Sequence, residues 1–140
     1  MAKTAPIHSP SGRHILMELT GCSFELLNSV EKVRTLLLDC AADGGATIIS
    51  SHFHPFSPQG LSGVVVIAES HITIHTWPES GYAAVDVFTC GKVEIADLVS
   101  EYIAKRSQAK KVSLSSFSRS PSGTQILKPS THHTEELAHA

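Results

Sequence analysis

A serine, a histidine and a cysteine lie close together in the middle of this 140-residue sequence, between Glu69 and Cys90. Ser70 directly follows the acidic residue Glu69, and His75 comes five positions later. A hydroxyl so placed can attack the carbonyl of the preceding peptide bond, which cuts the chain and leaves a new electrophile at the fresh N-terminus. An imidazole can move protons near neutral pH, and a thiol can donate one. The residue types and their order are therefore compatible with chemistry at the bond between Glu69 and Ser70.

Neighbouring residues add to this interpretation. Ser62 could donate a hydrogen bond to the Glu69 carbonyl oxygen as it becomes an oxyanion. Gly63, Gly81 and Gly91 permit tight backbone geometry around the site. A lone Glu-Ser pair is usually an ordinary strand end, a lone histidine on an apolar strand is usually structural, and a lone cysteine is usually a small buried hydrophobe. Only the combination of these residues favours a function.

Further characteristic residues extend this combination over 12–91. Its most specific blocks include Glu69-Ser70-His71, the run Ile74-His75-Thr76-Trp77-Pro78-Glu79, and the run Phe88-Thr89-Cys90-Gly91. The full blocks cover 61–71, 74–79 and 81–91, with shorter ones at 12–14, 53–54 and 56–60. This pattern resembles the prokaryotic S-adenosylmethionine decarboxylase proenzymes, a pyruvoyl-dependent family. Ser80 departs from the bulkier, usually aromatic residue often found there, which affects pocket shape rather than processing.

The resemblance implies self-cleavage between Glu69 and Ser70, giving a β chain of residues 1–69 and an α chain of residues 70–140. Ser70 Oγ would attack the Glu69 carbonyl to form an ester. Elimination and hydrolysis would then convert Ser70 into a covalent pyruvoyl group, with loss of ammonia. The pyruvoyl ketone forms a Schiff base with the substrate amine and accepts the electrons released as carbon dioxide leaves.

The resemblance also implies a role for each neighbouring side chain. His75 would transfer protons during processing, and Ser62 would support the same step. Cys90, by analogy, would return a proton to the α-carbon of the substrate after decarboxylation.

Four further positions match the substrate pocket of the family. An aromatic face there stacks on adenine, and a carboxylate accepts hydrogen bonds from the ribose hydroxyls. Phe56, Trp77 and Glu79 stand at the matching positions of this sequence. Glu18 stands where the family has another substrate-site carboxylate.

The implied reaction converts S-adenosylmethionine to S-adenosylmethioninamine, the aminopropyl donor for spermidine synthesis. Two alternatives stay open. A pyruvoyl-dependent arginine or ornithine decarboxylase would keep the processing residues and differ in its pocket. A non-enzymatic metal-binding module could use the pairs His52/His54 and His71/His75 together with Cys90, although this spacing matches no common zinc pattern. We expect no metal site.

Size, charge and cysteine content narrow the range of partners. A chain of 15.0 kDa has room for one domain with a modest core, so we expect a homodimer of αβ units to complete a deep site, as in the family. The net charge of -2 predicts no binding to nucleic acid or an anionic membrane. The sequence has neither a membrane-spanning apolar stretch nor the apolar core of a signal peptide. The odd, widely spaced set Cys22, Cys40 and Cys90 argues against disulfides and favours a cytoplasmic protein.

The hydrophobic pattern predicts an α+β two-layer sandwich, with a largely antiparallel sheet and helices on one face. One helix is expected from Val30 to the Gly44-Gly45 stop, and a second over 93–109. Because strands mostly follow strands, crossovers are few. The expected strands lie at 14–21, 46–53, 62–68, 83–90 and 111–117.

The two ends of the chain differ from the middle in composition and in hydrophobic periodicity. Residues 1–12 carry prolines and no periodicity, so we expect a flexible lead-in. The decarboxylase domain is expected over 13–117. Residues 118–140 are rich in Ser, Pro, Thr and His without an apolar period, which predicts a disordered tail.

Overall fold

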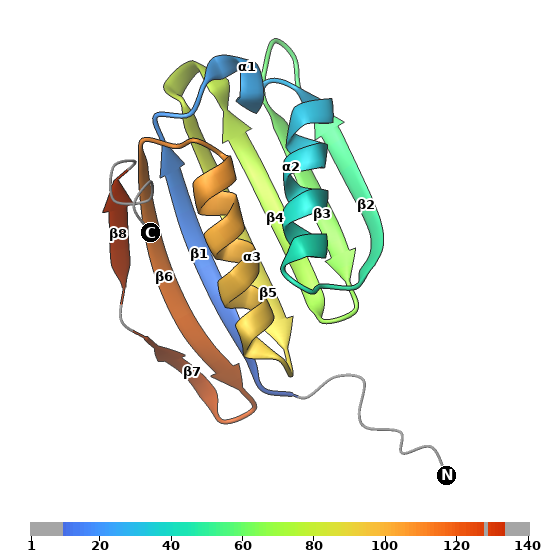
Figure 1. Cartoon of the computed structure of the whole chain (residues 1–140), viewed down its shortest axis with the longest axis vertical. Coiled ribbons are helices and arrows are strands. Elements are labelled where there is room, and N and C mark those ends of the chain that lie inside the picture. Colours follow the sequence, from blue (N-terminus) through green and yellow to red (C-terminus); the bar gives the residue numbers. More distant parts are fainter. Residues whose placement is uncertain (1–9, 128, 134–140) are drawn as a thin grey trace.

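The described part of the chain, residues 10–127 and 129–133 of a computed structural model, is built on one antiparallel sheet. The strands lie in the order β2-β3-β4-β5-β1-β6-β7, and β8 pairs with the other half of β6. They are β1 (Gly12–Thr20), β2 (Ile48–Pro55), β3 (Leu61–Ile67), β4 (Ser70–Trp77), β5 (Tyr82–Cys90), β6 (Lys111–Ser120), β7 (Gly123–Ile126) and β8 (Ser130–His133). Figure 1 shows the two long helices on one face of this sheet, which confirms the predicted α+β sandwich.

Serine side chains cap the first two helices. The Ser29 hydroxyl accepts a hydrogen bond from the Lys32 N–H at 3.1 Å, which starts α2 (Val30–Asp43), and Gly44 ends it. The other helices are the short α1 (Phe24–Leu27), the 3-10 turn η1 (Pro78–Ser80) and α3 (Val93–Arg106). No helix in the described residues is long and apolar enough to cross a membrane.

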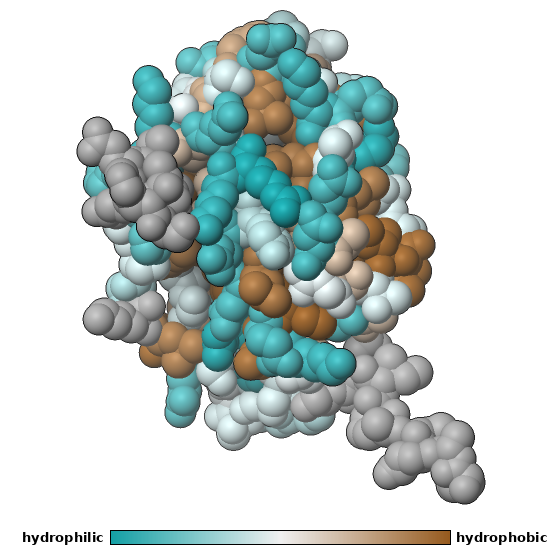
Figure 2. Space-filling view, viewed as in Figure 1, coloured by the Kyte–Doolittle hydropathy of each residue, from teal (hydrophilic) through white to brown (hydrophobic). Residues whose placement is uncertain are grey.

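The core lies between the helices and the sheet. Burial of apolar surface here is the main force that holds the two layers together. Its fully buried side chains come from both layers and include Met17, Leu19, Val33, Leu37, Ile72, Ile74, Val87, Val99 and Ile103. The side of the molecule that carries the helices is mostly hydrophilic, with hydrophobic patches beside them (Figure 2).

Side chains on the other side of the sheet face away from α2 and α3, and we call this surface the open face. Successive strand residues point to opposite sides, so each buried residue alternates with one on the open face. The open face carries most of the predicted site residues, namely Glu18, Ser62, His75, Trp77 and Cys90, together with His14, His71 and Asp86.

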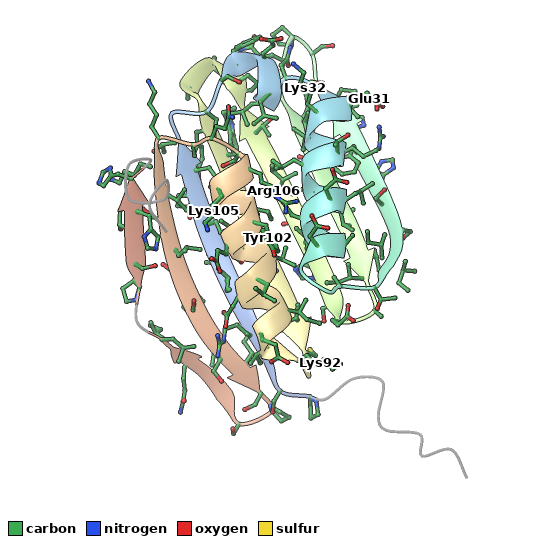
Figure 3. All side chains as sticks on the ribbon, viewed as in Figure 1. Glu31, Lys32, Lys92, Tyr102, Lys105 and Arg106 are labelled. Atoms are coloured by element: carbon green, nitrogen blue, oxygen red, sulfur yellow. The ribbon has the colours of Figure 1, made fainter. Side chains whose placement is uncertain are left out.

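An ion pair joins α3 to α2. Arg106 and Tyr102 lie on the side of α3 that is turned toward α2 (Figure 3). The Arg106 guanidinium lies 4.4 Å from the centre of the Tyr102 ring and pairs with the Asp43 carboxylate at 2.8 Å. The ion pair links the last residue of α3 to the last residue of α2, and the ring contact holds the guanidinium against α3 itself.

The structure corrects the predicted strand list in the middle of the chain. The run Ser70–Trp77 is a full strand, β4, which the list did not include. Its residues alternate between burial and the open face because β4 lies inside the sheet between β3 and β5. The predicted second helix ends at Arg106 rather than at 109, and the short helix α1 was not predicted.

The prediction of a disordered tail over 118–140 is wrong for the part that the structure describes. Strand β6 continues to Ser120, and both β7 and β8 pair with it. Backbone pairing along the edge of β6 satisfies N–H and C=O groups and requires no apolar period. The polar composition of this segment therefore wrongly indicated disorder. Positions 128 and 134–140 lie outside the described residues, as do 1–9 of the expected lead-in, whose last residue, Gly12, begins β1.

Candidate active site

Ser70 is the first residue of β4 and follows a two-residue turn that joins β3 to β4. Ile67 and Ser70 are paired across this turn, so the bond between Glu69 and Ser70 lies inside a tight hairpin. The φ angle of Ser70 is 154°, a value that residues other than glycine rarely adopt. The backbone is therefore strained at the residue whose hydroxyl is predicted to attack.

Strand β5 places Cys90 against both the Glu69 carbonyl and the Ser70 hydroxyl, the two groups that the predicted cleavage would join. The Cys90 N–H donates a hydrogen bond to the Glu69 carbonyl oxygen at 2.8 Å. The Ser70 hydroxyl donates to the Cys90 sulfur at 3.5 Å. A backbone N–H directed at a carbonyl oxygen polarises that carbonyl and stabilises the negative charge that an attacking hydroxyl creates. The sequence indicated the thiol but gave no sign of this backbone donor, because β-sheet register is not visible in a list of residues.

Ser62 and His75 form a hydrogen-bonded pair of their own. Ser62 Oγ lies 2.7 Å from His75 Nδ1, and the two residues are paired between β3 and β4. This pair stands at the opposite end of the hairpin from Ser70. Five residues of β4 separate His75 from Ser70, which corresponds to about 16 Å in an extended strand. A single chain therefore does not bring Ser62 or His75 to the bond at Ser70.

The predicted pocket residues surround the Ser62–His75 pair instead. A cavity of about 330 Å³ is lined by Phe56, Gln59, Leu61, Ser62, His75, Thr76, Trp77 and Glu79. The Gln59 amide donates to the Glu79 carboxylate at 3.1 Å, which orients that carboxylate. Gln59 belongs to the block 56–60 that carries the resemblance, yet sequence reasoning assigned it no role.

Glu18 lies at the same end of the sheet as this cavity and is hydrogen-bonded to Tyr82. The Tyr82 hydroxyl donates to the Glu18 carboxylate, and the Tyr82 ring stacks on Trp77 with centroids 5.2 Å apart. The hydrogen bond to Glu18, together with partial burial, raises the pKa of Tyr82 to about 12, so the phenol keeps its proton and continues to donate. Sequence reasoning missed Tyr82, although it lies in the block 81–91.

The three glycines singled out in the sequence fall into two kinds. Gly81 and Gly91 have φ angles of 63° and 86°, where glycine avoids the strain of a side chain. Gly63 does not have a positive φ. A Cβ on Gly63 would lie 2.3 Å from Phe53 Cδ1, so this position needs glycine for space.

A second polar cluster lies on the open face and begins beside Ser70, because it includes His71. The Arg119 guanidinium carries only donors, so His14 Nδ1 accepts its hydrogen bond at 3.0 Å. The proton of His14 then sits on Nε2, which donates to Asp86 Oδ2 at 2.6 Å, and His71 Nε2 lies 3.1 Å from the same oxygen. Burial alone would raise the pKa of Asp86, but the hydrogen bonds from His14 and His71 outweigh it and hold that pKa well below its usual range. These residues come from four strands, so their spacing in the sequence gave no signal.

The sequence profile of the family described as S-adenosylmethionine decarboxylase matches residues 13–120, which is most of the chain. The chain belongs to the S-adenosylmethionine decarboxylase family. The match covers the hairpin, the cavity and the second polar cluster, and it extends into β6.

Individual members of the S-adenosylmethionine decarboxylase family agree with this assignment. A proenzyme of this name from Pelotomaculum thermopropionicum is 56% identical over 100 residues, covering 71% of this chain and 79% of the relative. One from Thermodesulfovibrio yellowstonii is 47% identical over 128 residues, covering 91% and 89%. The crystal structure of the adenosylmethionine decarboxylase from Aquifex aeolicus superposes with a TM-score of 0.71 at 36% identity, covering 89% of this chain and 91% of that one.

The residues proposed from sequence for a metal-binding alternative to the decarboxylase are not brought together. His75 bonds to Ser62, and His54 packs against Phe56 with ring centroids 4.9 Å apart. Within the described residues, the one group whose ligand atoms all lie within 4.8 Å is His14, His71 and Asp86. A metal there would need the bare Nε2 of His14, whereas Arg119 keeps the proton on that atom.

Proposed function

We propose that this chain is the proenzyme of a self-processing, pyruvoyl-dependent S-adenosylmethionine decarboxylase. The observation that carries the proposal is the contact of the Cys90 N–H with the Glu69 carbonyl oxygen at 2.8 Å, beside the Ser70 hydroxyl. It polarises the bond to be attacked in a chain whose family is shown.

The processing step follows from these contacts. Ser70 Oγ attacks the Glu69 carbonyl carbon, the C–N bond breaks, and the hydroxyl proton moves to the amide nitrogen, which becomes an amine. Loss of the Ser70 α-proton and cleavage of its Cβ–Oγ bond release Glu69 as a free carboxylate and leave dehydroalanine. Its tautomer reacts with water and loses ammonia, so the α chain begins with a pyruvoyl group.

The residues around Ser70 fit this group. The pyruvoyl group supplies a ketone that condenses with an amine and withdraws the electron pair freed by decarboxylation. Cys90 Sγ lies 3.5 Å from Ser70 Oγ, within reach of a substrate atom bound beside the ketone. We assign Cys90 the return of a proton to the substrate α-carbon.

The separation of Ser62 and His75 from Ser70 supports a shared site in a homodimer. The open face exposes apolar side chains that one chain leaves uncovered, including Leu16 at 38% and Val66 at 40% exposure. A two-fold axis lying between two open faces and perpendicular to the strands exchanges the two ends of each hairpin. The partner's His75 then lies at the Ser70 end, where it can transfer protons during processing, and the partner's Ser62 supports that step.

The cavity beside the Ser62–His75 pair favours a nucleoside over a free amino acid. Phe56 and Trp77 offer aromatic faces for adenine, and Glu79, held by Gln59, offers a carboxylate for the ribose hydroxyls. Glu18, held by Tyr82, is assigned to the same substrate. Arginine or ornithine would leave these groups without partners, so S-adenosylmethionine is the proposed substrate and the aminopropyl donor for spermidine synthesis is the product.

The cysteines fit a cytoplasmic location, which we include in the proposal. All three are free thiols. Burial raises the pKa of Cys22 and of Cys40 to about 11, which keeps both protonated and unreactive.

Denaturing mass spectrometry of the purified protein tests the proposal. The wild-type chain should give fragments of residues 1–69 and 70–140, and the second should be lighter than its hydrolysis product by one ammonia. Ser70→Ala should stay whole. Carbon dioxide release should occur with S-adenosylmethionine and not with arginine or ornithine. A free serine amine on the second fragment, or cleavage of Ser70→Ala at this bond, would refute the mechanism.

A further inference from the structure

The residue Thr47, immediately before β2, binds the turn that contains the cleaved bond. Its N–H donates to Glu69 Oε1 at 3.1 Å, and its hydroxyl donates to Glu69 Oε2 at 3.3 Å. Its carbonyl oxygen accepts a hydrogen bond from the Ala68 N–H at 2.8 Å. Both residues of the turn are therefore bonded to one residue of another segment.

The Thr47 hydrogen bonds and the Cys90 contact both act on Glu69. The Glu69 carboxylate is held by Thr47, and the Glu69 carbonyl oxygen is held by the Cys90 N–H at 2.8 Å. Glu69 thus cannot rotate about its backbone without breaking bonds at one side or the other. The next residue, Ser70, has the strained φ of 154°, a conformation that persists only when surrounding contacts impose it.

We propose that Thr47 is a positioning residue for self-cleavage. It fixes the Glu69 carboxylate so that the Glu69 carbonyl stays against the Cys90 N–H while Ser70 Oγ attacks. Thr47 touches neither reacting atom, so its effect passes through Glu69. The inference rests on the proposed self-processing at this bond.

The three hydrogen bonds between Thr47 and the turn, which we call the clamp, are needed only before the chain is cut. After cleavage, Glu69 is the C-terminal residue of one fragment and is no longer joined to the residue at position 70. Thr47 should therefore govern the rate at which the cofactor is made, and the turnover of enzyme that already holds the cofactor should not depend on it.

The experiment is a time course of cleavage in freshly refolded protein, followed on denaturing gels. Thr47→Val keeps the β-branched shape and removes the hydroxyl, and we expect it to slow cleavage about tenfold, the low end for a hydrogen bond to a charged group. Thr47→Ser should restore the rate. Thr35→Val, on the exposed side of α2 away from the hairpin, is the matched control and should cleave as wild type does.

Two further measurements separate positioning from general destabilisation. Carbon dioxide release per cleaved chain should be within about twofold of wild type in Thr47→Val, because the processed site no longer uses the clamp. Combining Thr47→Val with Glu69→Gln should slow cleavage less than the product of the two single effects, because both changes weaken one contact. Wild-type cleavage rates in Thr47→Val, or strictly multiplicative effects, would overturn the inference. A wild-type chain that never cuts would instead refute the proposed function itself.

Discussion

His75 lies at the opposite end of the β3–β4 hairpin from Ser70, paired with Ser62 at 2.7 Å between Ser62 Oγ and His75 Nδ1. The separation of about 16 Å along the strand is too long for a proton to pass directly between the two side chains. A site that uses both residues must therefore draw them from two chains. The sheet offers its open face for that purpose, since the helices cover only the other one (Figure 1).

Co-expression of two inactive variants tests whether the site is shared. Ser70→Ala and His75→Ala should each remain uncut alone. Together they form mixed dimers in which an intact Ser70 meets an intact His75 of the partner subunit, so about half or less of the His75→Ala chains should be cleaved while the Ser70→Ala chains stay whole. Differently sized tags would distinguish the chains on a gel.

The matched control for that experiment combines His75→Ala with a chain carrying both Ser70→Ala and His75→Ala. Its dimers have the same composition but no intact His75, so no cleavage is expected. Cleavage in the control, or none in the first mixture despite mixed dimers, would contradict a site shared between chains.

Replacing the Cys90 thiol should separate making the cofactor from using it. In Cys90→Ser the backbone N–H still holds the Glu69 carbonyl oxygen, so the chain should still be cut, although more slowly. A serine hydroxyl is far less acidic than a thiol, so carbon dioxide release from S-adenosylmethionine should fall about a hundredfold or more. Gel cleavage and carbon dioxide release measured on one preparation give both quantities. A processed variant with wild-type decarboxylation would leave the thiol with a structural role only.

The sequence was sufficient to single out the local group of candidate residues. Glu69, Ser70 and Cys90 are recognisable from residue type and order, and the structure places Cys90 against the other two. The position of His75 could not be predicted in the same way, because an offset of five residues gives a short distance in a turn and a long distance in a strand. The strand list missed β4, and with it the separation of His75 from Ser70.

Contacts that depend on sheet register could not be predicted either. Thr47 and Glu69 are 22 positions apart, and Arg119 is 105 positions from His14. The fold class was accessible because apolar alternation marks buried strands and helices. The last strands were missed because β7 and β8 are held by backbone pairing to β6 and show no apolar alternation.

Acid should remove the contribution of Asp86 to folding. Its pKa is lowered in the folded protein, so the charged carboxylate stabilises the fold above the unfolded value near 3.8, and that stabilisation is lost as the pH falls below it. The free energy of unfolding should therefore differ most between wild type and Asp86→Asn at pH 5 to 7, and the difference should shrink below about pH 4. Urea unfolding in the uncut Ser70→Ala background measures it.

Glu94→Gln is the control for this pH dependence, because Glu94 is exposed in the first turn of α3. Its unfolding curves should follow those of the Ser70→Ala background at every pH. A constant difference between Asp86→Asn and the background from pH 7 to pH 3 would show that the charge of Asp86 does not stabilise the fold.

The carboxylate of Glu79 should decide how tightly the substrate binds while leaving cleavage unaffected. Glu79 lines the cavity beside Ser62 and His75 and is oriented by Gln59, and a carboxylate accepts hydrogen bonds from two ribose hydroxyls better than an amide does. In Glu79→Gln the chain should still be cut at the wild-type rate, because the Glu79 carboxylate bonds to Gln59 and has no part in the proposed proton transfers of processing. The KM for S-adenosylmethionine should rise about tenfold, with a smaller change in kcat, because the ribose contact is present in both the bound substrate and the transition state.

Steady-state carbon dioxide release over a range of substrate concentrations measures both constants, with Glu94→Gln again as the control. A lower kcat at unchanged KM would mean that Glu79 acts on the reacting carbon and does not hold the ribose.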